Sequence, residues 1–280
     1  MAAAILAIPT GGSASLGSKT ITQNGTYYAS ADSLDGFSYV DVSVSGGGGS
    51  GDLGAFLAGE LSIVNENTAL SVRDYAAYSN STITGINMGA ATAIGVSAFY
   101  WCSNLSTASF PACTEISERA FYGCYNLASL SLPVCETIWS SAFEGCASLP
   151  SLNLPSCVSL FDYAFLGCSK METADLPLCK TIYSRAFSGC SKLSTVSIPT
   201  CTSIGSYAFR QCYKLVSLYL TSVTSVPSLN ANNPFLSTPI GGYTASTGGQ
   251  YGSVFVPSSL YSDFLTAANW SAISDRIVSV

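Results

Sequence analysis

Apolar residues recur every 22 residues through the central half of the chain, between stretches rich in serine and threonine. In each unit, an isoleucine or leucine lies five residues before a phenylalanine, and leucines with the spacing L-x-x-L-x-L follow. The phenylalanines that keep this step are Phe99, Phe121, Phe143, Phe165, Phe187 and Phe209. A constant period of this length predicts a solenoid, in which each turn buries the apolar face of its neighbours.

The segment LASLSLPVCETI (127–138) shows what one turn should form. Its leucines at positions 130 and 132 alternate with serine, which predicts a short strand with one buried face. Pro133 ends that strand because proline has no amide hydrogen for the sheet. The pattern L-x-x-L-x-L-x-x-C-x-x-I in this segment is that of a leucine-rich repeat. One strand per turn, stacked in parallel about 4.8 Å apart, then predicts a leucine-rich-repeat solenoid. We therefore expect an α/β fold with short parallel strands and a 22-residue repeat.

The regions outside the strict repeat predict caps and a separate N-terminal module. The stretch 72–93 keeps the register but lacks the cysteines, as a capping turn should. Near the C-terminus, YGSVFVP predicts a strand, and the apolar residues after it have helical spacing. The expected regions are an N-terminal β module at 1–45, a flexible Gly/Ser linker at 46–52, a lead-in segment at 53–71, the solenoid at 72–226 and an α+β C-terminal cap at 227–280.

All eleven cysteines belong to two columns that keep the 22-residue step. A metal site needs clustered cysteines such as C-x2-C, whereas the closest pair here is eleven residues apart. A disulfide framework would join neighbouring turns, where in-register side chains lie too far apart for ideal geometry, and would leave one sulfur over. We favour buried structural thiols. The columns are Cys102, Cys124, Cys146, Cys168, Cys190 and Cys212, and Cys113, Cys135, Cys157, Cys179 and Cys201.

One variable column is the best candidate for binding. The position after the repeat isoleucine holds Trp139, Phe161 and Tyr183 in three consecutive turns. Aromatic side chains supply large contact area at low entropic cost, which suits a sugar or a partner protein. A second apolar layer that covers these rings is an equally open interpretation. Nearby positions add four more candidate ligand-binding residues, namely Tyr163, Tyr207, Arg119 and Arg185.

The composition of the chain limits the catalytic mechanisms and the classes of ligand that it can support. The chain has no histidine, so triads and imidazole acid–base catalysis are excluded. Only 9% of its residues are charged and its net charge is −6, so no basic stripe exists for nucleic acid. The N-terminal run MAAAILAIPTGG lacks preceding basic residues and is a poor secretory signal, and no apolar segment is long enough to span a membrane. We expect no cofactor and no metal.

The repeat unit I-x-x-x-A-F-x-x-C-x-x-L-x-x-L-x-L-P resembles the BspA-like leucine-rich repeats of bacterial surface proteins, over residues 72 to about 226. This resemblance implies a surface or secreted protein with a role in adhesion. The flanking segments KTITQNGTYYASADSLDGFSYVDVSV and VFVPSSLYSDFLTAANWSAISDRI are similar to modules in proteins of phages and prophages of Gram-positive bacteria.

These resemblances lead to a non-enzymatic recognition or structural protein as the main hypothesis. It would belong to a phage tail or virion and bind a host-surface glycan or protein, with virion proteins or further copies of itself as possible partners. The alternative is a secreted BspA-like adhesin on the bacterial cell surface. A third hypothesis, of another class, is a carbohydrate-active enzyme with two carboxylates in a cleft.

Overall fold

The computed structural model describes residues 71–280, apart from 73 and 231, together with the backbone of the strands that precede them. These early strands are β1 (Ala3–Ile8), β2 (Ala14–Leu16), β3 (Lys19–Ile21), β4 (Gly25–Ser30), β5 (Val42–Val44), β6 (Ile63–Asn65) and the start of β7 (Ala69–Val72). β1 pairs with β4 and β2 with β3, both antiparallel. The Gly/Ser linker predicted at 46–52 lies outside the described residues.

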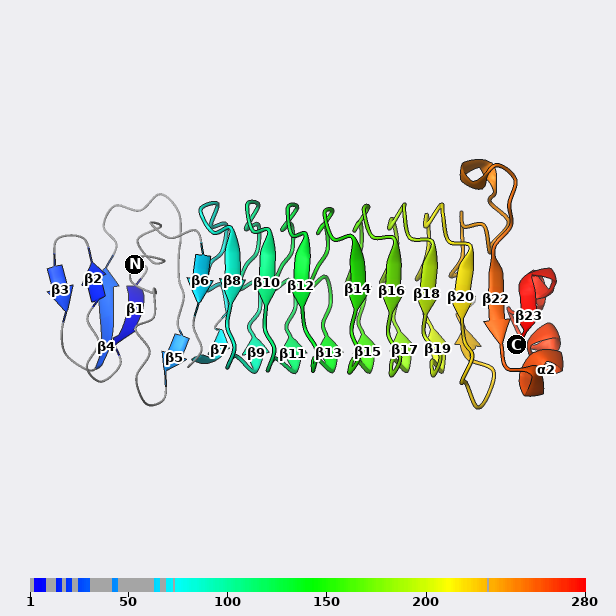
Figure 1. Cartoon of the computed structure of the whole chain (residues 1–280), viewed down its shortest axis with the longest axis horizontal. Coiled ribbons are helices and arrows are strands. Elements are labelled where there is room, and N and C mark those ends of the chain that lie inside the picture. The colour runs from blue at the N-terminus through cyan, green and yellow to red at the C-terminus, as the bar shows by residue number, and fades with distance from the viewer. Residues whose placement is uncertain are drawn as a thin grey trace.

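The described repeats form the predicted solenoid, whose turns are stacked side by side (Figure 1). Each turn contributes two strands, whereas the sequence predicted only the first. The longer strands are β8 (Gly85–Asn87), β10 (Thr107–Ser109), β12 (Ser129–Ser131), β14 (Ser151–Asn153), β16 (Thr173–Asp175), β18 (Thr195–Ser197) and β20 (Ser217–Tyr219). The shorter ones are β9 (Ala93–Ile94), β11 (Glu115–Ile116), β13 (Thr137–Ile138), β15 (Ser159–Leu160), β17 (Thr181–Ile182), β19 (Ser203–Ile204) and β21 (Ser228–Leu229).

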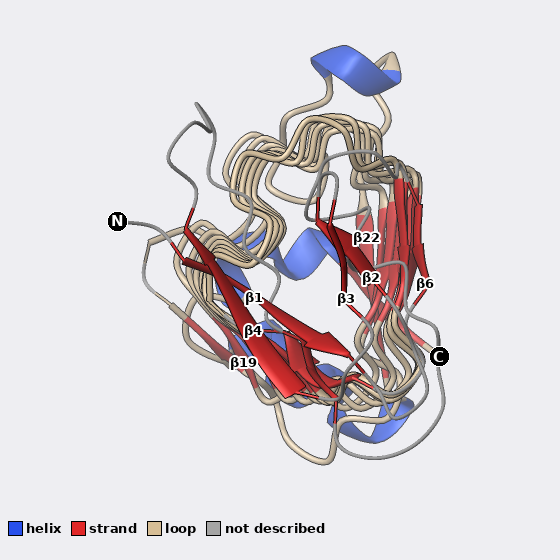
Figure 2. Cartoon of the chain, turned by 90° about the vertical axis from the view of Figure 1, so that its left-hand side faces the viewer, coloured by secondary structure: helices blue, strands red, loops and turns tan. Residues whose placement is uncertain are grey.

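Strict register follows from the repeat length. Partners in neighbouring solenoid strands are usually 22 residues apart, as in Ile116 with Ile138, so every column of the sequence becomes a row in space. The shorter strands form a parallel sheet that runs without a break from β7 to β21, and β5 closes it as an antiparallel edge. Viewed along the solenoid axis, the two sheets form separate walls and superposed loops complete each turn (Figure 2).

A third wall, formed by the Ala-Phe segments, has no strands. There amides bond alternately within the turn and to the next turn: Ala120 N–H donates to the Ser117 carbonyl, and Phe121 N–H to the Ala142 carbonyl. The residue before each Ala-Phe pair adopts left-handed backbone, with φ between 53° and 61°. Left-handed backbone is uncommon outside glycine. These residues are Ser97, Arg119, Ser141, Tyr163, Arg185 and Tyr207.

The core is organised around a stack of phenylalanine rings. The six rings of the repeat are at most 1% exposed, and neighbouring ring centroids lie 5.0 to 5.6 Å apart. Phe235, from the segment after the repeats, continues the stack at 5.9 Å from Phe209. Stacked aromatic pairs add to the stabilisation that burial alone provides. The stack therefore ties each turn to its neighbours through the centre of the molecule.

The sheet of longer strands is divided in two at Pro150. Strands β6 to β12 form one parallel group, and β14 to β20, with the cap strands, form another. In the turns on either side, the residue just before the longer strand donates its amide to the carbonyl 22 residues earlier. Ala128 donates to Ser106 in this way, and Glu172 donates to Pro150, both at 2.8 Å. Proline cannot donate such a bond. The interruption therefore has a local cause in the sequence.

The C-terminal segment covers the last turn. It contains η1 (Ala245–Thr247), β22 (Ser253–Val256), η2 (Ser258–Leu260), α2 (Tyr261–Thr266), η3 (Ser271–Arg276) and β23 (Ile277–Ser279). β22 pairs with β20 and β23 with β22, so the sheet continues into this segment. Trp270 is fully buried against Phe264, and its indole N–H donates to the Pro227 carbonyl at 2.7 Å. These contacts close the apolar end of the core.

Candidate binding surface

The variable aromatic column forms a ladder on the outside of three turns. Trp139, Phe161 and Tyr183 directly follow β13, β15 and β17, and their amides extend the ladder of backbone hydrogen bonds by one residue. The backbone spacing therefore places the rings in register. The centroids of Trp139 and Phe161 are 4.3 Å apart, and those of Phe161 and Tyr183 are 4.6 Å apart. We call these three side chains the aromatic ladder.

The aromatic ladder is accessible to solvent. Trp139 and Tyr183 each retain 38% exposure, and Phe161 between them is half-buried. The indole N–H of Trp139 donates to a carboxylate oxygen of Glu115 at 2.5 Å, which fixes the orientation of the first ring. This hydrogen bond was not anticipated from the sequence, although Glu115 lies just before the isoleucine of the preceding turn.

The stacking decides which parts of the rings a ligand can reach. Because the ring planes are inclined by only 22° and 7°, each inner face is covered by the neighbouring ring. A partner meets the ring edges, and only the two outer faces remain for stacking. Next to Tyr183 the column continues with Gly205, where a Cβ would lie 2.7 Å from the Tyr183 carbonyl carbon. Glycine is thus required there, so the next position of the column places no side chain over the outer face of Tyr183.

The four other candidate residues occupy the left-handed row. The Arg185 guanidinium donates to the Tyr163 hydroxyl at 2.7 Å and lies 5.2 Å from the ring centroid of Tyr207. These three side chains therefore form one cation–π cluster in consecutive turns. Arg119 is separated from that cluster by the turn of Ser141, and it pairs with Glu118 at 3.1 Å on the exposed surface. The structure brings together three of these four residues.

A second group of aromatic side chains lies on the N-terminal turns. Tyr78, Tyr100 and Tyr122 stack in register with centroids 4.8 Å apart. Trp101 and Tyr125 pack edge to face at 5.3 Å, and both are about 40% exposed. Tyr78, Tyr100 and Tyr122 keep the 22-residue step of the repeat, so their stacking follows from the register of the turns.

The eleven cysteines line the interior as two rows of free, buried thiols. In one row each thiol donates to the carbonyl of the residue 25 positions earlier, as Cys124 does to Phe99 at 3.1 Å. In the other row the acceptor lies two residues later, as with Cys113 and Glu115. Burial raises the pKa of Cys102 to about 12 and that of Cys113 to about 11. Such thiols are protonated and unreactive near neutral pH.

The described residues offer little for catalysis or metal binding. Among residues 71–280, no group of three or more acidic or cysteine side chains is arranged to hold a metal ion. A pocket of about 580 Å³ beside η1 has one carboxylate, Glu172, in its lining. Glycoside hydrolysis generally requires two. Within the described part of the chain, no helix has the length and apolar character needed to cross a membrane.

Comparison with known proteins decides the family. A family model for the BspA type leucine-rich repeat region matches residues 55–134 and 114–232 in six copies, more than half of the chain. The chain belongs to this family. BspA-type proteins are typically found at the cell surface or outside the cell, and leucine-rich repeats generally mediate protein binding. The resemblance seen in the repeat unit is therefore confirmed.

One solved structure, with a TM-score of 0.50, has the same fold, and two others are similar at lower TM-scores. A leucine-rich repeat protein of T. pallidum is similar over 55% of this chain and 82% of its own, with 23% identity and a TM-score of 0.50. A leucine-rich repeat protein from Bacteroides ovatus is 19% identical, over 71% of this chain and 56% of its own, with a TM-score of 0.46. A leucine rich cell surface protein from Faecalibacterium prausnitzii is 18% identical, over 71% and 78%, with a TM-score of 0.35. No curated protein matches the chain.

Proposed function

We propose that this BspA-type protein is a non-enzymatic recognition protein that binds a host-surface glycan or protein through the aromatic ladder. The observation that carries the proposal is the exposure of the ladder. Rows that point inward repeat the same apolar residue types and are buried, whereas this outward row varies along the array and keeps its rings in solvent. Exposed, pre-positioned aromatic side chains are typical anchors of binding surfaces.

The ladder favours an elongated partner that follows the solenoid axis. Its edges offer a rigid apolar ridge, and the outer face of Tyr183 offers one platform on which a sugar ring could stack. We place the protein on a phage tail or virion, because the segments that flank the repeats resemble phage modules. The alternative location, a bacterial cell surface, is supported by the usual location of BspA-type proteins.

The test is the simultaneous substitution of Trp139, Phe161 and Tyr183 by serine. Binding of the full chain to Gram-positive cells and to a glycan array should weaken by about 30-fold or more, since anchor residues commonly contribute at least 2 kcal/mol. A matched control replaces the exposed residues Ser131, Asn153 and Asp175, on another wall of the same turns, by alanine. Equal binding by the two variants would contradict the proposal. Immunogold labelling of virions and of host cells distinguishes the two locations.

A further inference from the structure

A row of lysines lies on the C-terminal half of the solenoid. Lys170, Lys192 and Lys214 keep the 22-residue step and come from three consecutive turns, just before the apolar residue that precedes β16, β18 and β20. The chain has only ten basic residues in all, so three in one row is a concentration of positive charge. In-register like charges on neighbouring turns repel each other. The repulsion within this row therefore lowers the stability of the fold, and a negatively charged ligand bound to the lysines would offset it.

The lysines of this row form no ion pair within the described part of the chain, although Glu172 lines the same pocket as Lys192 and Lys214. Among the described residues, the ion pairs involve Arg119 and Arg276 and none of these lysines. The Lys170 ammonium lies 3.4 Å from the Ser148 hydroxyl, and that of Lys214 donates to the Ser246 carbonyl. Lys192 is exposed, and within the described part of the chain its ammonium forms no hydrogen bond or ion pair.

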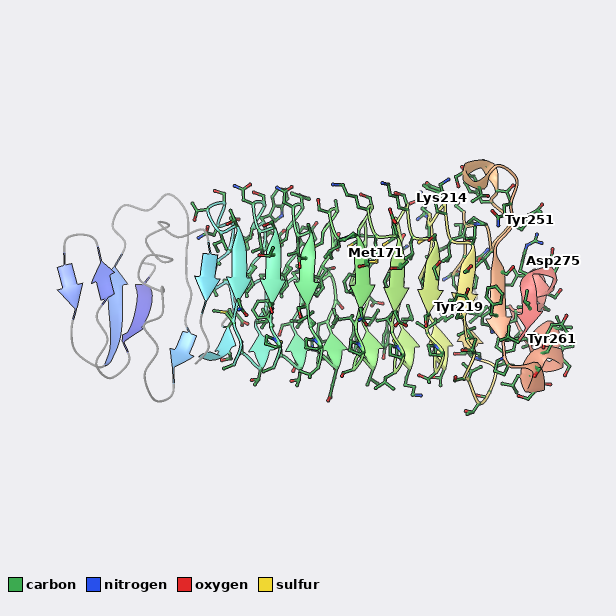
Figure 3. The ribbon with its side chains drawn as sticks, in the orientation of Figure 1. Met171, Lys214, Tyr219, Tyr251, Tyr261 and Asp275 are labelled. Carbon is green, nitrogen blue, oxygen red and sulfur yellow. The ribbon has the colours of Figure 1, made fainter. Side chains whose placement is uncertain are left out.

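The segment around η1 builds a pocket against this row. It interrupts the regular array between β21 and β22 and projects beyond the loops of the other turns (Figure 1). Lys214 lies beside this segment (Figure 3). The Lys214 ammonium donates to the Ser246 carbonyl and the Ser246 hydroxyl donates to the Tyr213 carbonyl, so two hydrogen bonds hold the segment against the last turn. In repeat proteins, such an insertion often lies on the binding face. The pocket is a shallow hollow, open to solvent, with a volume of about 580 Å³, which is large enough for one or two sugar rings.

The pocket lining combines cations with groups that bind hydroxyls. Lys192 and Lys214 supply the positive charge. The hydroxyls of Ser194 and Thr247 already donate to backbone carbonyls, so they offer a ligand hydrogen-bond acceptors, whereas the Gln250 amide can both donate and accept. The lining also contains Glu172 and Val216. A carboxylate accepts hydrogen bonds from sugar hydroxyls but repels a small, highly charged anion such as phosphate. The mixture therefore fits a ligand that carries both hydroxyls and a negative group.

We propose that this pocket binds an acidic saccharide, with its carboxylate or sulfate between Lys192 and Lys214 and its hydroxyls toward Glu172 and Gln250. The site is separate from the aromatic ladder, because none of the ladder residues lines the pocket. The proposal of this site therefore does not depend on the proposed function of the aromatic ladder. Its ligand would be a uronate or sulfated sugar of a surface polysaccharide.

The test compares three probes by isothermal titration with the full chain: an oligogalacturonate, the matching neutral galactose oligosaccharide, and inorganic sulfate. We expect the oligogalacturonate to bind at least tenfold more tightly than either of the others. The Lys192→Met variant should weaken that binding about tenfold, as expected for the loss of one charge-assisted hydrogen bond. Because Lys192 holds no other group in place, this variant should fold normally. The control is Lys180→Met, which removes another exposed positive charge outside the pocket.

Three results would overturn the proposal. Equal affinity for the neutral oligosaccharide would remove the role of the lysines. Sulfate binding as tight as that of the acid sugar would reduce the pocket to a simple anion site. Equal loss of affinity in the Lys192 and Lys180 variants would mean that overall charge, and not this pocket, attracts the ligand. A sulfated oligosaccharide in the same assay shows which of the two acidic groups is preferred.

Discussion

The two thiol rows predict an unusual loss of stability at alkaline pH. Burial raises the pKa of ten cysteines above the ordinary value near 9: to about 11 for Cys113 and Cys201, to about 12 for Cys102 and Cys157, and well above 9 for the other six. At pH 9 to 9.5, these thiols stay protonated in the folded protein, while those of the unfolded chain ionise. The unfolded state then binds fewer protons, so the free energy of unfolding falls as pH rises.

The magnitude follows from the number of thiols. A thiol with an unfolded pKa near 9 contributes a loss of about 0.4 kcal/mol at pH 9 and about 0.8 kcal/mol at pH 9.5. For ten thiols this amounts to about 4 and about 8 kcal/mol, which is comparable with the whole stability of an ordinary domain. Below about pH 8 the effect vanishes. Tyrosine ionisation contributes little at these pH values because its ordinary pKa is near 10.

The assay is urea unfolding followed by far-ultraviolet circular dichroism, under reducing conditions, from about pH 7 to about pH 9.5. A double variant, Cys157→Val with Cys179→Val, provides the matched control, because Val223 fills the corresponding position after the last repeat. In this variant, the fall in the free energy of unfolding between pH 7 and pH 9.5 should be about one fifth smaller, because two of the ten thiols are gone. This holds whatever the variant's stability at neutral pH. A free energy of unfolding that stays constant up to pH 9.5 would refute the reasoning. So would rapid modification of the native thiols by a disulfide reagent at pH 8.

Two further predictions concern the core and the divided sheet. Phe165→Ala should lower the free energy of unfolding by about 3–5 kcal/mol, because it opens a cavity between two stacked rings. Phe161→Ala in the aromatic ladder should lower it by less than about 1.5 kcal/mol. Urea unfolding at pH 7 measures both changes, and equal values would contradict the assignment of the core. At the Pro150 interruption, the Leu132 amide has no partner among the described residues, while the corresponding Leu154 amide donates to Asp175. Leu132 should therefore exchange its amide hydrogen faster than Leu154, and Pro150→Ser should slow it; unchanged exchange would mean that proline is not the cause.

Much of the fold could be predicted because the repeat forces equivalent residues into rows. The phenylalanine and cysteine columns lie inside as such an arrangement requires, and the strand ended by Pro133 is present as β12. The second strand of each turn was missed because two residues, such as Thr137–Ile138, are too short to show an alternating pattern. The left-handed row was also missed, since arginine and tyrosine give no local signal for positive φ.

The candidate surfaces were predictable only in part. The sequence placed Trp139, Phe161 and Tyr183 in one row, but which ring faces remain free depends on stacking angles and on Gly205. The lysine row keeps the same step and could have been found by aligning every residue type, not only the apolar ones. Its pocket could not, because the η1 segment has no repeat to align and its position depends on contacts such as Ser246 with Tyr213.

The direction of the hydrogen bonds between turns has a mechanical consequence. The strands lie across the long axis of the solenoid, so the bonds that join neighbouring turns point along it (Figure 1). A stretching force applied between β7 and β23 would break these bonds one turn after another from an end, instead of shearing many of them at once. Each released turn of 22 residues would add about 75 Å of extended chain. A molecule of this kind, held at one end and loaded at the other, would lengthen in steps and absorb work before its attachment fails.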